Sequence, residues 1–136
     1  MDTSGVILFN DDRFHNLGVG YDSGRFRDVG RIGVTRRPGD LGRFRTPSLR
    51  NVGMTGPYMH DGSIRTLPEV VEFYAKGGHP NPALDAVIGT RALTVEERAD
   101  LVAFLGSLTT EWLTDSAMVT ERLLARAARG SGDRPR

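Results

Sequence analysis

The chain of 136 residues contains no cysteine. It therefore forms no disulfide, no zinc–thiolate site and no thioether bond to a prosthetic group. Lysine is almost absent, because Lys76 is the only one and the other 17 basic residues are arginine. No run of 18 apolar residues predicts a membrane-spanning helix, and the first residues lack the pattern of a signal peptide. A net charge of +1 argues against a dedicated nucleic-acid binder.

Glycine, with 17 residues, is abundant in the first half of the chain. No apolar period lasts two helical turns within residues 1–66, so this half is predicted to be irregular. Such a long loop region in a compact domain usually wraps a ligand or carries function. The length fits a single domain, which we place at residues 1–112.

Helices are predicted in the second half. The first covers about residues 67–76, with Thr66 as its N-cap and Glu69 completing a capping box, and two glycines follow it. The second covers about residues 95–108, with Thr94 and Glu97 in the same roles. A third is predicted at about 116–128, in a peripheral segment at 113–129, and residues 130–136 are predicted to form a disordered tail. The predicted fold class is therefore all-α with long loops.

The three histidines lie too far apart in the sequence to predict a zinc site, which usually needs closely paired ligands. His79 stands between a glycine and a proline and is expected to be an exposed loop residue. His15 is expected to bond a backbone carbonyl.

The segment from Phe44 to Ser63, FRTPSLRNVGMTGPYMHDGS, has two readings. It is either a well-packed surface loop or a binding loop. In the second reading, backbone carbonyls around Thr55 and Pro57 are available to a hard cation such as calcium. Arg45 and Arg50 would then suit the carboxylates of a ligand.

Tyr74 also has two readings. It lies on the apolar face of the helix predicted at 67–76, so it is either a core tyrosine with a satisfied hydroxyl or a phenolate ligand to haem iron. The residues alone leave both open.

Five motifs in order now identify a resemblance: FNDDRFHNLGVG, FRTPSLRNV, TGPYMHDG, TLPEVVEFYAKGG and LTVEERADLVAFLGSLT. Together they resemble the C-terminal half of bacterial di-haem cytochrome c peroxidases, and most closely the MauG-like branch. The likeness runs from about residue 9 to residue 109. It implies a cytochrome c-like fold with haem c as cofactor, and an oxidoreductase that reduces peroxide or uses it to oxidise a protein side chain.

The resemblance also implies roles for individual residues. The family places an axial iron ligand fourteen residues after the histidine of its P-Y-x-H motif, which is Tyr74 counting from His60. Met54 and Met59 do not occupy that place. The backbone carbonyls of Thr55 and Pro57 match two calcium ligands of the family. His60 would lie beside the haem without binding iron, and Arg45 and Arg50 are candidates for contacts to haem propionates.

One family feature is missing, because the residues before LFNDDRFHN contain no haem-attachment motif. The chain is therefore expected to be inactive alone and to need an N-terminal haem domain or a second haem-bearing chain, together with a redox-protein electron donor. A truncated gene, a fragment that complements another chain and a relic scaffold all fit. The family location is periplasmic. The alternatives to an enzyme are a non-enzymatic electron-transfer module and a haem-free scaffold.

Overall fold

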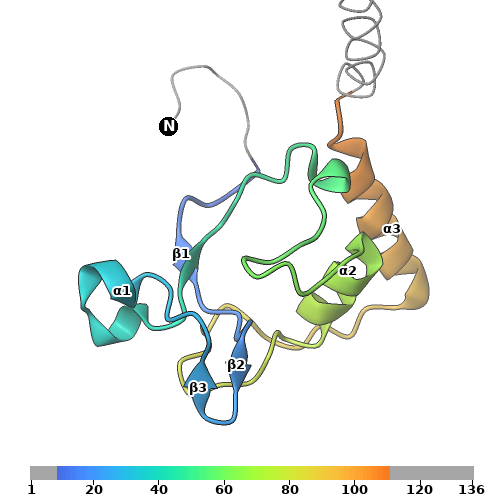
Figure 1. Ribbon diagram of the computed structural model, residues 1–136. Helices are drawn as coiled ribbons and strands as arrows, with labels where there is room; N and C mark the ends of the chain where they lie inside the picture. The colour runs from blue at the N-terminus through green and yellow to red at the C-terminus, as the bar shows by residue number, and fades with distance from the viewer. Residues whose placement is uncertain (1–8, 111–136) are drawn as a thin grey trace, which may run out of the picture.

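Two capped helices form the best-defined part of the fold. The computed structural model describes residues 9–110, so the helix predicted at 116–128 and the predicted tail lie outside the described residues. Helix α2 runs over Leu67–Ala75 and α3 over Val95–Ser107 (Figure 1). Both begin with the predicted capping boxes, in which the threonine side chain and the glutamate side chain each accept a backbone N–H. These two helices are confirmed almost to the residue.

The two helices pack against each other. Val71 and Ala75 of α2 are 6% and 4% exposed, and they are the only apolar side chains in residues 9–110 that are buried. Glu72 of α2 accepts a hydrogen bond from Arg98 Nη1 of α3 and pairs with Lys76 at 3.1 Å. The described part of the chain thus has a very small apolar core of its own.

The prediction of an all-α fold is wrong. Two antiparallel sheets of two strands each are present: β1 (Phe14–His15) pairs with β4 (Phe44–Arg45), and β2 (Tyr21–Asp22) pairs with β3 (Arg25–Phe26). The register places Phe14 opposite Arg45 and His15 opposite Phe44. Strands of two residues are too short to show an alternating pattern, so these pairings could not be read from periodicity.

Short helical turns complete the first half of the chain. They are α1 (Ile32–Thr35) and the 3₁₀ turns η1 (Pro38–Asp40) and η2 (Val52–Met54). Figure 1 shows α1 projecting from the molecule beside β1, on the side opposite α2 and α3. The loop between η2 and α2 runs between these two sides. The predicted irregular half is therefore an assembly of short elements.

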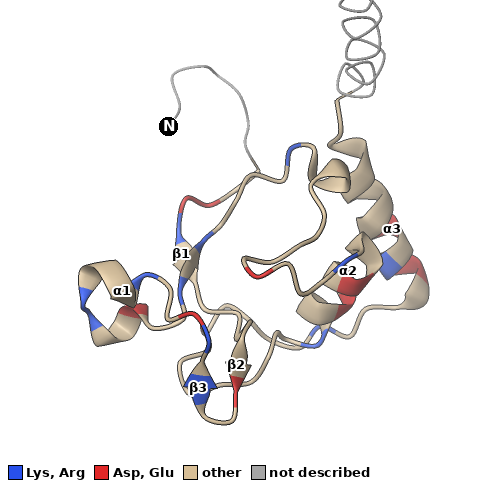
Figure 2. Ribbon diagram, in the orientation of Figure 1, with Lys and Arg blue, Asp and Glu red and all other residues tan. Residues whose placement is uncertain are grey.

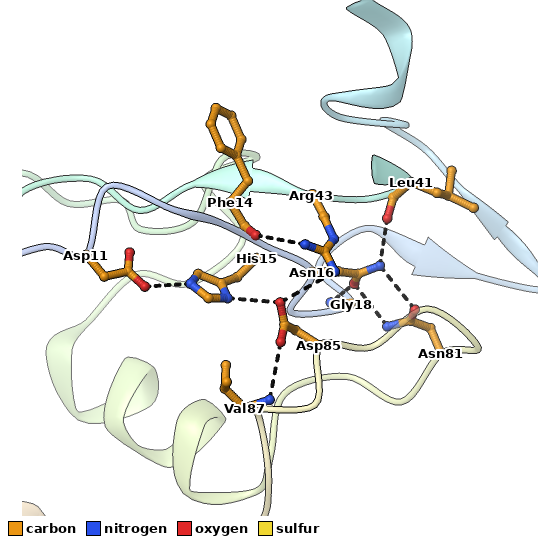
Figure 3. A network of polar contacts seen from close by, with 10 residues as sticks. All are labelled: Asp11, Phe14, His15, Asn16, Gly18, Leu41, Arg43, Asn81, Asp85 and Val87. Carbon is orange, nitrogen blue, oxygen red and sulfur yellow. Dashed lines mark hydrogen bonds and ion pairs between the residues drawn. The ribbon is translucent and has the colours of Figure 1, made fainter. Parts of the chain in front are cut away.

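A buried amide holds three loops together (Figure 3). Asn16, just after β1, is 0% exposed. Its Nδ2 donates to the Leu41 carbonyl at 2.9 Å, and its Oδ1 accepts from Gly18 N–H at 2.8 Å and from Asn81 Nδ2 at 3.2 Å. Gly18 has φ +78°, and a Cβ there would lie 1.8 Å from the His79 carbonyl oxygen. Only glycine therefore permits this close approach of two backbone segments.

Candidate functional site

Tyr74 lies near the C-terminal end of α2 and is 43% exposed. Its ring meets the ring of Phe73 edge to face, with centroids 5.7 Å apart. Within residues 9–110 its hydroxyl makes no hydrogen bond. Desolvation raises the pKa of this phenol above its usual value of 10.0. The side chain is therefore neither a fully buried core tyrosine nor a fully solvated one, and within residues 9–110 its oxygen has no hydrogen-bond partner.

His60 is fixed by an aromatic neighbour. Its imidazole stacks on the ring of Phe44, with centroids 3.6 Å apart and an interplanar angle of 9°. Since Phe44 belongs to β4, this stack joins the PYMHDGS loop to the β1–β4 pair. No hydrogen bond or ring contact links His60 to Tyr74 among the described residues. The structure therefore holds the two predicted haem-pocket residues on separate elements.

Thr55 and Pro57 are exposed in the loop after η2. Within the described part, neither backbone carbonyl accepts a hydrogen bond. The loop is braced nearby, because the Tyr58 hydroxyl donates to the Val52 carbonyl at 2.9 Å and Tyr58 N–H donates to the Ile64 carbonyl at 2.6 Å. Residues 9–110 contain no cluster of three or more His, Cys, Asp or Glu side chains suited to a metal. The two carbonyls are available, but a calcium site would need further ligands.

Arg45 and Arg50 are exposed and both contact the segment before β1. Arg45 Nη2 lies 2.7 Å from Asp12 Oδ1. The guanidinium of Arg50 lies over the ring of Phe9, 5.7 Å from its centroid.

A polar network around His15 was missed by sequence reasoning (Figure 3). Instead of bonding a carbonyl, His15 lies between two carboxylates: Nε2 is 2.7 Å from Asp11 Oδ2 and Nδ1 is 3.0 Å from Asp85 Oδ2. The bond to Asp11 is the largest cause of a raised His15 pKa. Asp11 stands four residues earlier and could have been suspected, but Asp85 is 70 residues away and left no signal in the sequence.

Several large apolar side chains of residues 9–110 remain exposed, among them Phe9, Met54, Tyr74, Leu101 and Phe104. Exposed apolar side chains of this kind can be covered by a bound group. The sequence contains no cysteine, so none of its residues can form a thioether bond to a haem.

Comparisons with known proteins find relatives among bacterial cytochrome c peroxidases and MauG. The chain is 50% identical over 82 residues to cytochrome-c peroxidase IdrP1 of Denitromonas iodatirespirans, covering 60% of the chain and 22% of that protein. It is 41% identical over 105 residues to the methylamine utilization protein MauG of Methylorubrum extorquens, covering 76% of the chain and 29% of MauG. The chain thus spans less than a third of the length of these curated relatives.

A solved structure agrees with the sequence comparisons. The crystal structure of a MauG-like protein associated with microbial copper homeostasis matches with a TM-score of 0.66 and 38% identity, over 79% of this chain and 36% of that one. This likeness fits a cytochrome c-like arrangement despite the small sheets. No protein-family model matches the chain.

Proposed function

Because the chain belongs to the family of bacterial di-haem cytochrome c peroxidases and MauG, we propose that it is part of a haem-dependent oxidoreductase. Its relatives imply haem c as the cofactor. The bound haem would supply one-electron redox chemistry, and the residues of this chain would bind and orient it. The observation that carries the proposal is the Tyr74 hydroxyl, which makes no hydrogen bond within residues 9–110 although desolvation raises its pKa.

In this proposal the phenol oxygen of Tyr74 would hold the haem iron. A neutral phenol with a raised pKa is a weak ligand by itself, so iron binding must offset the cost of removing its proton. Helix α2 supports the geometry, because the Thr66–Glu69 capping box defines its start and the buried Val71 and Ala75 fix its face. The haem-attachment cysteines and the opposite axial ligand would come from another part of a longer protein or from a second chain.

The remaining site residues have supporting roles in the same proposal. His60, held by the Phe44 stack, would pack against the haem without binding iron. The free carbonyls of Thr55 and Pro57 would ligate calcium together with groups outside the described residues. Arg45 and Arg50 would contact propionates. For Arg45 such a contact competes with its 2.7 Å pair to Asp12.

The proposed setting follows the family. Partners would be an N-terminal haem domain or another haem-bearing chain, and a redox protein that donates electrons. We propose a periplasmic location. None of the helices in residues 9–110 is long and apolar enough to cross a membrane.

A spectroscopic titration tests the role of Tyr74. The full 136-residue chain is titrated with ferric haem in the presence of imidazole, which replaces the missing axial ligand. We expect a shifted Soret band and a tyrosinate-to-iron charge-transfer band. Tyr74→Phe should abolish the charge-transfer band and weaken haem binding at least about tenfold, or about 1.4 kcal/mol.

Tyr21→Phe is the matched control, because Tyr21 packs on Phe26 in the β2–β3 pair and plays no part in the proposed site. It should leave the spectrum and affinity unchanged. If Tyr74→Phe behaves like the unaltered chain, Tyr74 is not the ligand. If haem does not bind at all, the haem-free scaffold remains as the better account. Haem binding without peroxide turnover, after a haem-bearing partner is restored, would favour an electron-transfer module.

A further inference from the structure

A hollow lies away from Tyr74, between β1, the α1–η1 turn and the loop around Asp85. Its volume is about 660 Å³, within the usual size of small-molecule sites, about 300–1,000 Å³. Four arginines line it: Arg13, Arg31, Arg37 and Arg43. None of the residues assigned to the haem site lines it. A hollow lined by four arginines favours a negatively charged ligand.

The carboxylates of this hollow already have cationic partners. Asp40 Oδ2 lies 3.3 Å from Arg31 Nε. Asp85 Oδ2 lies 3.0 Å from His15 Nδ1 and 3.9 Å from Arg43 Nη2. The third, Asp12, pairs with Arg45 from outside the hollow. The wall therefore has no carboxylate left over to balance further positive charge.

Two of the four arginines have no such partner. Within residues 9–110, the guanidinium groups of Arg13 and Arg37 make no ion pair or hydrogen bond. The backbone of Arg37 is nevertheless fixed, because its N–H donates to Thr35 Oγ1 at 3.3 Å and the Thr35 hydroxyl donates to Asp40 at 2.8 Å. Figure 2 shows basic residues next to β1 and on either side of α1, whereas most of the acidic residues of the second half gather on α2 and α3. The hollow thus carries excess positive charge, and hydrogen bonds hold the backbone at Arg37 in place.

One wall of the hollow is apolar. The guanidinium of Arg31 lies over the Phe14 ring, 4.0 Å from its centroid, and Phe14 and Val87 both line the space. A ring with a cation above it, beside two free guanidinium groups, suits an organic molecule with acidic groups better than a bare inorganic ion.

We propose that this hollow binds a small organic anion with at least two acidic groups, carboxylate or phosphate. Arg37 and Arg13 each bind one acidic group, and Phe14 and Val87 contact the carbon skeleton. Guanidinium forks recognise both carboxylate and phosphate oxygens in a bidentate manner. The site is independent of haem and of Tyr74, so its test does not depend on the proposed redox function.

Calorimetric titration of the full chain with citrate and with fructose 1,6-bisphosphate tests the proposal. Both probes are organic molecules with several acidic groups, and they separate carboxylate from phosphate preference, while glycerol serves as an uncharged control. We expect saturable binding of at least one anion, weakened by added salt. Arg37→Gln should reduce the affinity about tenfold, and Arg13→Gln combined with it should remove measurable binding.

Arg36→Gln is the matched control, since Arg36 is the neighbouring residue, carries the same charge and does not line the hollow. It should leave the affinity within about twofold of the unaltered chain. As a second measurement, which needs no variant, anion-induced shifts in NMR spectra should fall on the backbone amides of residues 12–15 and 31–43. An equal loss of affinity in Arg36→Gln, shifts spread over the whole surface, or no binding of either anion would each overturn the proposal.

Discussion

At the residue scale, the most informative side chain is His15, because both of its ring nitrogens face carboxylates. The hydrogen bond between His15 and the Asp11 carboxylate raises the pKa of His15 above its ordinary 6.5. Partial burial lowers this pKa, but by a smaller amount. In return, the bond to His15 holds the pKa of Asp11 far below its ordinary 3.8. Desolvation raises the pKa of Asp85, but the Val87 N–H and His15 bonds outweigh it, so the net pKa is lowered. An imidazolium between two carboxylates is the favoured state.

This arrangement predicts a pH-dependent stability. Because the folded-state pKa of His15 is raised, its contribution is fully present below pH 6.5 and is lost as the pH rises through the folded-state pKa. The pKa values of Asp11 and Asp85 are lowered, so their contribution is present above pH 3.8 and is lost as the pH falls. Arg43, 3.9 Å from Asp85, stays charged throughout and retains part of the interaction. The network should therefore stabilise the folded chain most between pH 3.8 and pH 6.5.

Urea unfolding at pH 5–6 and at about pH 9 provides the measurement. The urea concentration at the unfolding midpoint of the unaltered chain should decrease from pH 5–6 to about pH 9. The same rise in pH should lower the midpoint of His15→Gln by a smaller amount. His79→Gln is the control, since His79 is exposed and its imidazole has no part in the network. Equal pH dependence in all three chains would contradict the assignment.

At the scale of elements, α2 and α3 owe their start positions to local chemistry. In α3 the Thr94 side chain accepts the Glu97 N–H at 3.2 Å, and Glu97 Oε2 accepts the Thr94 N–H at 2.8 Å. Two large apolar side chains of this helix, Leu101 and Phe104, are exposed, at 41% and 49%. With so little burial, the cap is a large part of what defines the helix.

Thr94→Ala should lower the free energy of unfolding by about 1 kcal/mol, because it removes one half of the capping box. Thr94→Ser keeps the hydroxyl and should recover most of that loss. Chemical denaturation followed by far-UV circular dichroism gives the comparison. If the alanine and serine variants unfold alike, the cap does not stabilise α3 in the way described.

At the scale of the whole molecule, the described residues bury few apolar side chains and leave several large ones exposed. Val71 and Ala75 are the only buried apolar side chains in residues 9–110, whereas Asn16 is completely buried. Hydrogen bonds among the loops therefore order the first half of the chain, and apolar burial contributes little there. Burial of apolar surface stabilises by roughly 25 cal/mol per Å², so a bound haem would add a large share of the total stability.

We therefore expect a broad, low-temperature melt for the isolated chain and a sharper, higher one with haem and imidazole. At a free-ligand concentration of about 100 times the dissociation constant, linkage predicts about 2.7 kcal/mol of added stability. Tyr74→Phe should show a smaller gain. A cooperative melt at high temperature without any ligand would contradict this picture of an incomplete core.

The sequence by itself determined the parts of this protein that depend on neighbours three or four residues apart. Thr66 with Glu69 and Thr94 with Glu97 place two helix starts correctly, because a capping box is a local hydrogen-bond pattern. The motifs also identified the family, since their order along the chain is itself sequence information. The roles assigned to Tyr74, His60, Thr55 and Pro57 remain proposals.

Only the tertiary structure decided which distant residues meet. The Phe44–His60 stack, the bond between Asn16 and Asn81 and the contact of His15 with Asp85 join residues 16 to 70 positions apart. It also decided that four arginines line one hollow. Loops bring such groups together through backbone hydrogen bonds and glycine turns, and these leave no periodic pattern in the sequence. The contacts could not be predicted from the sequence because loop closure joins residues that lie far apart along the chain.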